Sequence, residues 1–336
     1  MNNFFKIKNF TIGKKRTFII AEIGINHNGN LKYAKKLIQA AKKSGADAAK
    51  LQIINPEESY AKNTNSHKIF NKNLLKFDEL KILSKYAKDK KILLFATPGD
   101  FSSLKIVEKL NFPAIKISSG LMNNIPLIRK CAKMKLPIII STGFAEYEEI
   151  KEALRNITRY HKKLAVLKCT SLYPAPLTSL NLNSIKKLQN LGAVVGYSDH
   201  SLGELSCIVA VSLGAKVIEK HFTLNKKQKG ADHKISMTPK EFSIMVNKIR
   251  EIEESLGGED TFPTQKELMI RNLYRRTIVS SKIIKKGKKI EKKDLLLQRN
   301  NLSGKKLHPR DFFKLIGKKS KKTILPNKLI KKNDFF

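Results

Sequence analysis

Short apolar runs alternate with segments of helical spacing along most of the chain. After the first run, for example, Leu31, Leu37 and Ile38 would share one face of a helix. Each run has the length of a β-strand, and there are eight of them: Phe18–Ile23, Ala48–Ile53, Ile92–Ala96, Ala114–Ile117, Pro137–Ser141, Leu164–Cys169, Ala193–Tyr197 and Lys216–Glu219. Eight strand–helix units in succession are the number that closes a parallel barrel, so we expect an α/β fold of the (β/α)8, or TIM-barrel, type. An open, doubly wound sheet is the alternative, but no G-x-G-x-x-G sequence follows the first strand.

The chain is strongly basic, with 67 Lys and Arg against 28 Asp and Glu and a net charge of +39. Such an excess would suit a nucleic-acid-binding protein, because cationic surfaces attract phosphates. The lysines, however, recur along nearly every predicted helix and loop, and aromatic residues are not interleaved with them. We therefore expect no nucleic-acid partner and interpret the charge as a general basic field that favours anionic substrates.

Neither a membrane segment nor a secretion signal is expected. No run of about 18 or more apolar residues occurs, and Met1–Phe10 lacks the apolar stretch of a signal peptide. The three cysteines, Cys131, Cys169 and Cys207, form no C-x-x-C pair and suggest reduced thiols. We expect a cytoplasmic protein with no membrane partner.

Polar or charged residues stand at the end of every predicted strand. They are Glu22; Lys50 and Gln52; Thr97; Lys116 and Ser119; Ser141; Ser171 and Tyr173; Ser198, Asp199 and His200; and Glu219 and His221. Charged side chains in buried parallel strands are unfavourable unless they are paired or functional. Because the C-terminal ends of the strands form the active-site face of such barrels, this pattern predicts a single site there.

Two lysines suggest what the site binds. Lys50 and Lys116 lie on separate predicted strands, near the turns Ser118–Gly120 and Ser141–Gly143. Two ammonium groups with hydroxyls and backbone N–H groups make a cradle for phosphate, so we expect a small dianionic ligand. A single lysine could instead form a Schiff base, as in aldolases, but two lysines on separate strands favour charge clamping.

His200 and His221 end neighbouring predicted strands, so their imidazoles could converge on one divalent metal. Oxygens of substrate or water would complete the coordination of Mn²⁺, or of Mg²⁺ or Co²⁺. Two histidines with ordinary hydrogen bonds are the alternative, but Glu219 and Asp232 nearby favour a metal and substrate-hydroxyl site, where the metal would act as a Lewis acid. His27 could cap a helix, bond the backbone or face the substrate.

Taken together, these segments resemble the sialic acid synthase family. They follow the family order across nearly the whole predicted barrel: Ala21–Gly29, Lys50–Gln52, Thr97–Pro98, Lys116–Gly120, Pro126–Ile128, Ser141–Gly143, Cys169–Pro174, Gly196–His200 and Ile218–Thr223. Any one of these motifs is weak, but the set is highly specific.

The resemblance implies an enzyme that condenses phosphoenolpyruvate with the open-chain aldehyde of an N-acetylated hexosamine, giving a nine-carbon 2-keto acid and phosphate. It implies catalytic roles for Glu22, Lys50, Lys116, His200 and His221, the last two as metal ligands. Substrate contacts are implied for Gln52, Thr97, Ser119, Ser171, Tyr173, Ser198, Asp199, Glu219 and Asp232. Gly99-Asp100 replaces an aromatic residue and Ser171 replaces the Asn of some relatives, which bears on substrate detail rather than reaction type.

The barrel pattern ends near Gly257-Gly258. We assign residues 1–260 to the barrel, 261–274 to a polar linker and 275–336 to a second domain, in which Ile283–Ile290 and Ile324–Ile330 repeat one turn pattern. This segment resembles the β-clip antifreeze-like (SAF) domain of the same family. That likeness implies a domain-swapped homodimer in which Arg299 reaches the sugar N-acetyl group in the partner's barrel. Arg299 could otherwise be a surface residue, and the module alone would suit RNA or ice binding.

The acceptor sugar stays open among N-acetylmannosamine, its 6-phosphate and a 2,4-diacetamido-trideoxy hexose. Val195–Gly203 and Ala231–Lys234 are slightly more similar to legionaminic acid synthases. Enzymes that make seven- or eight-carbon keto acids from sugar phosphates are the alternative class, and the antifreeze-like segment argues against them.

Overall fold

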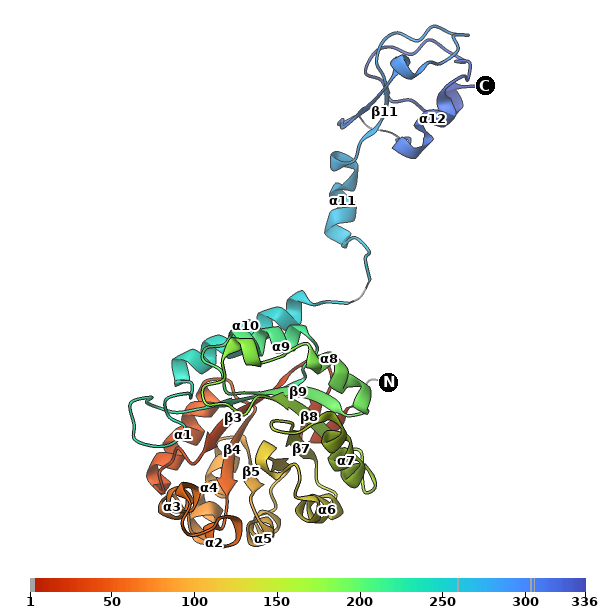
Figure 1. Ribbon diagram of the computed structural model, residues 1–336. Helices are drawn as coiled ribbons and strands as arrows, with labels where there is room; N and C mark the ends of the chain where they lie inside the picture. Colours follow the sequence, from red (N-terminus) through yellow and green to blue (C-terminus); the bar gives the residue numbers. More distant parts are fainter. Residues whose placement is uncertain (1–3, 259, 303, 305) are drawn as a thin grey trace. The chain divides into compact units, whose positions relative to one another are not determined.

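Eight parallel strands form a closed barrel in the computed structural model, as the apolar runs predict (Figure 1). The structure describes residues 4–258, 260–302, 304 and 306–336. The order around the barrel follows the sequence, and β10 closes the ring against β3. The strands are β3 (Phe18–Gly24), β4 (Ala48–Ile53), β5 (Leu93–Pro98), β6 (Ile115–Ile117), β7 (Ile138–Ser141), β8 (Leu164–Cys169), β9 (Val194–Asp199) and β10 (Val217–His221).

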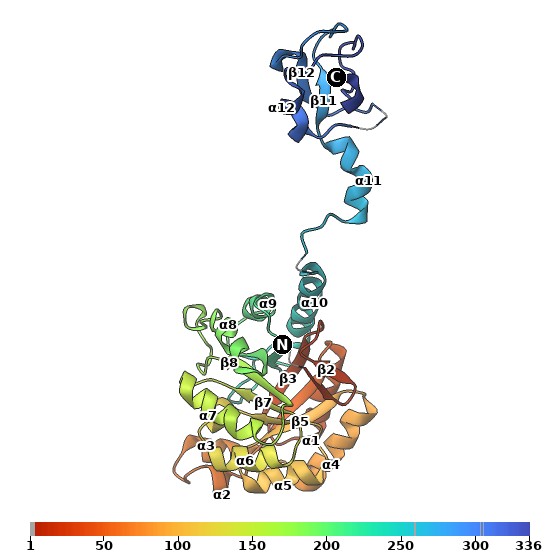
Figure 2. The same ribbon diagram turned by 90° about the vertical axis from the view of Figure 1, so that its right-hand side faces the viewer.

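Helices surround the barrel strands (Figure 2). Helix α1 buries Ala34, Leu37, Ile38 and Ala41, the face that the sequence predicts. The helices of this unit are α1 (Leu31–Lys43), α2 (Pro56–Ser59), α3 (Asn65–Lys72), α4 (Phe77–Asp89), α5 (Phe101–Lys109), α6 (Ile125–Lys133), α7 (Tyr147–Thr158), α8 (Ser184–Leu188), α9 (Leu205–Ser212) and α10 (Pro239–Ser255). With helices outside and side chains inside, both faces of the wall are buried, which explains why the strands are apolar runs.

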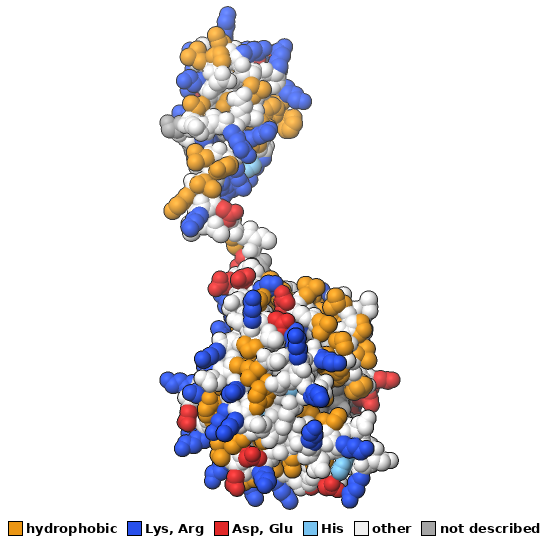
Figure 3. All heavy atoms as spheres, turned by 90° about the vertical axis from the view of Figure 1, so that its left-hand side faces the viewer, with side chains coloured by type: hydrophobic (Ala, Val, Ile, Leu, Met, Phe, Trp, Pro, Cys, Tyr) orange, Lys and Arg blue, Asp and Glu red, His pale blue; other side chains and the backbone are white. Residues whose placement is uncertain are grey.

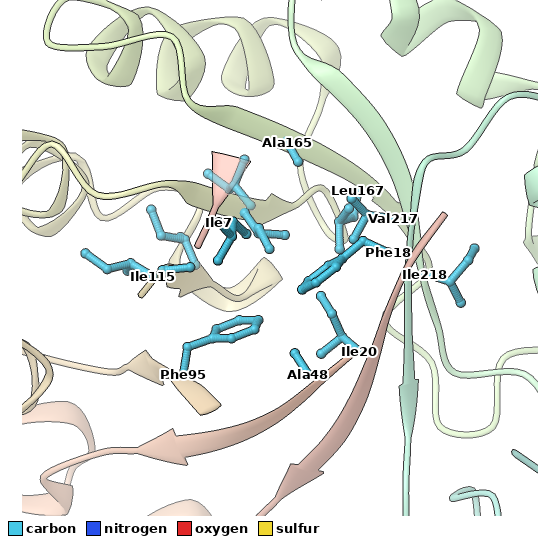
Figure 4. Close-up of a cluster of buried hydrophobic side chains, with 14 of the residues drawn as sticks. Ile7, Phe18, Ile20, Ala48, Phe95, Ile115, Ala165, Leu167, Val217 and Ile218 are labelled. Atoms are coloured by element: carbon cyan, nitrogen blue, oxygen red, sulfur yellow. The ribbon is translucent and has the colours of Figure 1, made fainter. Parts of the chain in front are cut away.

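Buried apolar side chains fill part of the barrel interior. Figure 4 shows Phe18, Ile20 and Phe95 pointing toward one another within one buried cluster. The N-terminal hairpin, β1 (Phe5–Ile7) and β2 (Phe10–Ile12), adds Ile7, which is completely buried in the same cluster. Apolar residues therefore fill the N-terminal end of the barrel, and the polar residues that follow them in the strands lie toward the C-terminal end.

The chain divides into two compact units, residues 1–257 and 258–336. Within the segment assigned to a polar linker, 261–274, Gln265–Tyr274 forms helix α11, which the sequence analysis did not predict. The cause is a capping box: Thr264 Oγ1 accepts a hydrogen bond from Glu267 N at 3.2 Å, and Glu267 Oε2 accepts one from Thr264 N at 2.7 Å. This T-x-x-E signal is local and readable in the sequence.

The second unit contains a two-stranded sheet, β11 (Thr277–Ser280) and β12 (Leu295–Gln298), and a short helix, α12 (Phe312–Leu315). Its two similar turn segments pair with each other through reciprocal backbone bonds between Ile284 and Ile324, at 2.9 and 2.8 Å. Each segment is followed by a short 3-10 helix, at Lys292–Asp294 and Lys332–Asp334. The sequence repeat is therefore also a repeat of structure.

Three expectations from the sequence concern the distribution of charge, the cysteines and membrane-spanning segments. On the face drawn in Figure 3, Lys and Arg side chains are scattered among polar and apolar ones instead of forming one stripe. All three cysteines are buried and free. Within the described ranges, none of the helices combines the length and the apolar character that crossing a bilayer requires.

Candidate active site

Lys50 lies at the centre of a buried polar cluster at the C-terminal ends of the strands. Its Nζ lies 2.9 Å from Glu22 Oε2 and 3.7 Å from Glu219 Oε2, and it donates a hydrogen bond to Thr97 Oγ1 at 3.0 Å. Gln52 Nε2 donates to the other oxygen of Glu22 at 2.9 Å. Residues from four strands therefore meet at one ammonium group, as expected for inward-pointing residues of a closed barrel.

A β-bulge directs Glu22 toward this cluster. The register between β3 and β4 shifts between Glu22 and Gly24, and Gly24 has a φ of +54°, in the left-handed region that favours glycine. A Cβ on Gly24 would lie 3.3 Å from Glu22 Oε1, 3.4 Å from Gln52 Nε2 and 3.7 Å from Asp232 Oδ2. Glycine thus lets the three polar side chains meet over the backbone.

Lys116 forms the second half of the cluster. Its Nζ donates to Ser141 Oγ at 2.6 Å and lies 3.7 Å from Glu219 Oε1. Ser198 Oγ donates to the same Glu219 oxygen at 2.9 Å. Ser141 was not among the expected substrate contacts. It is the last residue of β7, at a position whose side chain faces the barrel interior, and this alternation could have identified it from the sequence.

Burial and neighbouring charges act in opposition on these groups. Burial lowers the pKa of Lys116 below its usual value. Burial acts on Lys50 in the same direction, but the carboxylates of Glu219 and Glu22 outweigh it and hold the pKa of Lys50 above its usual value. Burial alone would raise the pKa of Glu219, yet Lys116 and Lys50 hold it below its usual range. Lys50 has two close carboxylates and Lys116 has one, so Lys116 carries the less compensated charge and is the stronger attractant for an anion.

Two imidazoles face each other beside the cluster. The ring centroids of His200 and His221 are 5.4 Å apart, and the Tyr173 ring stacks on His200 at 4.1 Å. His200 Nδ1 lies 2.8 Å from Thr170 O, which can only accept, so Nδ1 carries the proton. In the neutral imidazole His200 Nε2 is then an acceptor, and it lies 3.0 Å from the Tyr173 hydroxyl.

The histidine pair suits a divalent metal in part. Within the described ranges, no group of three or more His, Cys, Asp or Glu side chains is arranged to hold a metal ion. His221 Nδ1, however, is buried without a hydrogen-bond partner in the described structure, and Asp232 Oδ2 lies 3.8 Å from it. An unsatisfied imidazole nitrogen is the kind of donor that such an ion binds, and two nitrogens would leave positions for substrate or water oxygens.

The loop that carries Asp232 is tied to the end of β3. Asn26 Nδ2 donates to Phe222 O at 3.0 Å and to Ser236 Oγ at 2.9 Å, and Ser236 Oγ donates in turn to Asp232 O at 2.6 Å. Of the three alternatives for His27, the structure shows the backbone bond: His27 Nδ1 accepts from Gly29 N at 3.1 Å. Asn26 was not among the expected site residues.

Some predicted contacts lie at the edge of the cluster. Ser119 Oγ accepts a hydrogen bond from Gly143 N at 3.0 Å, and Ser171 Oγ lies 4.0 Å from Cys169 Sγ. Asp100, one of the departures from the family pattern, caps α5 by accepting from Ser103 N at 2.7 Å. Arg299 is exposed in the second unit, with its guanidinium 5.5 Å from the centroid of the Tyr274 ring.

The expectation that Asp199 contacts substrate is wrong in this structure. Its Oδ2 pairs with Lys220 Nζ, and neither side chain has any exposed surface. Asp199 also accepts from Tyr197 OH at 2.9 Å and from Ser206 Oγ at 2.7 Å, the latter on α9. Because successive strand residues face opposite sides of the wall, Ser198 points inward and Asp199 points toward the helices.

A separate cavity exists elsewhere in the first unit. About 1010 Å³ in volume, it lies at the N-terminal ends of the strands beside the hairpin, and its lining includes Lys8, Phe10, Lys85 and Phe112. Its lining residues include no His, Cys, Asp or Glu. It therefore offers neither an acid–base pair nor a metal ligand, and the chemistry belongs to the cluster at the opposite end of the barrel.

A closed barrel with two ammonium groups and two imidazoles at the C-terminal ends of its strands defines an enzyme for a small anionic substrate. Residues 37–261 match the model of the NeuB family. The chain is 38% identical over 320 residues to N,N'-diacetyllegionaminic acid synthase of Legionella pneumophila, covering 89% of each chain. It is 35% identical over 349 residues to pseudaminic acid synthase of Campylobacter jejuni, covering 98% of this chain and 99% of that one.

A solved structure shows the same relationship. The N-acetylneuraminic acid (sialic acid) synthetase of Leptospira borgpetersenii, crystallised with citrate, matches with a TM-score of 0.77 and 33% identity. The match covers 80% of this chain and 95% of that one. The chain therefore belongs to the NeuB family of sialic-acid-type synthases, as its motifs predict.

Proposed function

We propose that this enzyme condenses phosphoenolpyruvate with the aldehyde of a 2,4-diacetamido-2,4,6-trideoxy hexose, giving a nine-carbon 2-keto acid of the legionaminic type and phosphate. The observation that carries the reaction is the buried pair of Lys50 and Lys116 at the barrel mouth, balanced by Glu22 and Glu219. Support for the acceptor comes from the two segments that resemble legionaminic acid synthases and from the Legionella relative. N-acetylmannosamine and its 6-phosphate are the competing acceptors.

The two lysines would clamp the anionic groups of phosphoenolpyruvate. Lys116, with the less compensated charge, would face the phosphate together with Ser119, and Lys50 would remain tied to Glu22 and Thr97. Donors fixed in advance stabilise charge that develops in the transition state without reorganisation at the moment of reaction. Gln52, Ser171, Tyr173, Ser198, Glu219 and Asp232 complete the proposed set of substrate contacts.

The reaction forms one C–C bond and breaks one C–O bond. C3 of phosphoenolpyruvate attacks the aldehyde carbon, water adds at C2, and the resulting tetrahedral centre expels phosphate. The aldehyde oxygen gains a proton and the water loses one, so the exchange needs a group that both accepts and donates protons. Glu22, bonded to Gln52 and paired with Lys50, is the carboxylate placed to carry this proton.

His200 and His221 would hold Mn²⁺ or a similar divalent ion. When bound, this ion would supply Lewis-acid polarisation of the aldehyde oxygen. The chain's own contribution is orientation, since Thr170 O fixes the tautomer of His200 and Asp232 lies beside His221.

The second unit would act as an antifreeze-like domain that exchanges between the two subunits of a homodimer. In this proposal Arg299 reaches the N-acetyl group of the sugar in the partner's barrel. Its exposure supports a role outside its own unit. A cytoplasmic location is part of the proposal, because the relatives are named as sugar-acid synthases.

Phosphate release from phosphoenolpyruvate with Mn²⁺ tests the proposal. The acceptors are N-acetylmannosamine, its 6-phosphate and the diacetamido sugar, each assayed with and without a chelator. The expected result is release with the diacetamido sugar that is lost on chelation and in His200→Ala. His67→Ala is the matched control, because His67 pairs with Glu57 on the neighbouring short helix, outside the cluster. Faster release with N-acetylmannosamine would overturn the proposed acceptor, and no release with any acceptor would overturn the reaction.

A further inference from the structure

The ends of β9 and β10 carry three consecutive pairs of polar residues, of which the first two are cross-strand pairs. Ser198 lies opposite Glu219, and Asp199 lies opposite Lys220. His200 and His221 follow directly, one on each strand end. Side chains alternate between the two faces of a strand, so the first and third pairs face the barrel interior and the middle pair faces the helices.

The middle pair is the last tie between the two strands. The paired register of β9 and β10 runs from Tyr197 opposite Ile218 to Asp199 opposite Lys220. His200 lies beyond the last paired residue of β9, in the turn that leaves the barrel. Its distance from His221 therefore depends on what holds that turn in place.

The Asp199–Lys220 pair holds the turn from both sides. Asp199 Oδ1 accepts a hydrogen bond from Ser201 N at 2.8 Å, and Lys220 Nζ donates to Ser201 O at 2.5 Å. The backbone directly after His200 is thus bonded through its N–H and its C=O. Tyr197, Ser206 and Cys207 donate to the remaining positions on the Asp199 carboxylate.

A completely buried ion pair such as Asp199–Lys220 contributes little net stability to a fold. Removing two charges from water is unfavourable, and well-packed apolar residues of similar volume often stabilise a protein as well or better. What an ion pair with directed hydrogen bonds adds is a defined geometry. Here the defined geometry fixes the two strand ends that carry the imidazoles.

We infer that Asp199 and Lys220 are positioning residues that set the spacing and orientation of His200 and His221 from outside the barrel wall. The inference rests on the proposed function only for what the histidines do, not for where they lie. It also explains why Asp199 and Lys220 stand next to the two histidines in sequence without facing the site.

The test replaces Lys220 with Met and reads the histidines directly. Metal-free protein labelled with ¹⁵N-histidine reports the tautomer of each imidazole by NMR, and His200→Gln assigns the signal. Wild type is expected to show His200 protonated on Nδ1, because Thr170 O accepts from it. In Lys220→Met this signal should shift or broaden, and Mn²⁺ affinity, measured by calorimetry, should fall about 10- to 100-fold.

Asp47→Asn is the matched control. Asp47 is also a buried carboxylate in an ion pair, with Arg250 at 3.4 Å, and it bonds Ile19 N at 2.9 Å. It precedes β4, at the opposite end of the barrel from the histidines. This variant should unfold at a lower urea concentration and leave both the His200 signal and Mn²⁺ affinity as in wild type.

Two outcomes would overturn the inference. One is a folded Lys220→Met protein with an unchanged His200 signal and Mn²⁺ affinity within about twofold of wild type. The other is an equal loss in Asp47→Asn, which would mark a general effect of stability. If Lys220→Met does not fold, the double variant Asp199→Leu, Lys220→Met replaces the pair with apolar side chains and is read in the same way. Failure of the proposed function looks different: wild type would show the expected histidine signals and release no phosphate.

Discussion

Lys50 Nζ lies 2.9 Å from Glu22 Oε2, and both side chains are almost completely buried. Each charge is tolerated in the barrel because the other is there. The same contact fixes the carboxylate that is proposed to carry a proton and the ammonium group that is proposed to bind the substrate. Stability and activity therefore depend on the same pair, but they should respond differently to its removal.

Lys50→Met should destabilise the protein by about 3–5 kcal/mol, because it leaves the buried Glu22 carboxylate without its cationic partner and leaves Glu219 with Lys116 alone. Phosphate release should fall about 100-fold or more. Adding Glu22→Gln should restore much of the stability, because it removes the buried carboxylate that Lys50→Met leaves unpaired. It should restore none of the activity, because both charged groups are then missing. Urea unfolding and phosphate release measure the two effects. A double variant as unstable as Lys50→Met would contradict the pairing argument.

Gly143→Ala should disturb the serines beside the phosphate cradle. A Cβ on Gly143 would lie 2.0 Å from Ser171 Oγ and 2.7 Å from Ser119 Oγ, so both side chains would have to move. We expect the KM for phosphoenolpyruvate to rise about 10-fold, the size of an effect expected from a displaced hydrogen-bond donor to a charged group. Steady-state kinetics at saturating acceptor measure it. Gly120→Ala is the control, because no atom lies within 4 Å of its Cβ position, and an equal effect there would refute the steric explanation.

Stability should fall as the pH is lowered from about 6.5 to about 4, in part because of His27. Burial lowers the pKa of His27 from 6.5 to about 4. Between these values the unfolded chain binds the proton and the folded chain does not, so the free energy of unfolding decreases with falling pH, by at most about 3 kcal/mol.

The variant His27→Asn isolates this contribution, because its side-chain oxygen can still accept from Gly29 N. Urea unfolding of both proteins at several pH values should show a shallower acid loss in the variant. Parallel curves would show that His27 is not the group responsible.

Mixing two inactive variants tests the exchange of the second unit. His200→Ala and Arg299→Ala each disable one part of the proposed site. If Arg299 acts in the partner's barrel, mixed dimers contain one intact site, and refolding the two proteins together should recover about a quarter of wild-type activity. The control is each variant refolded alone. Recovery of nothing, from samples shown to contain mixed dimers, would place Arg299 in the site of its own subunit. Full activity of Arg299→Ala refolded alone would place Arg299 outside any site.

Much of this protein can be predicted from its sequence because the signals are local. The eight apolar runs indicate the strands, and their polar ends indicate the site, since chain direction alone brings the C-terminal ends of parallel strands to one face. Lys50, Thr97 and Glu219 meet there. The helix at Gln265–Tyr274 was missed although its capping box is equally local.

The direction in which the Asp199 side chain points is decided by the tertiary structure. The sequence of a strand shows that its side chains alternate between two faces. Which of the two sets points into the barrel depends on where the strand ends and how it pairs with its neighbours. The apolar run predicts a strand that ends at Tyr197, whereas pairing with β10 extends it to Asp199 and turns that carboxylate toward Lys220. Sequence patterns are enough to predict the barrel, the family and the chemical groups at the strand ends. Barrel closure decided which of those groups meet in the interior and which form contacts on the helix-facing side of the strands. The physical reason is that contacts between strands distant in sequence exist only once the barrel has closed.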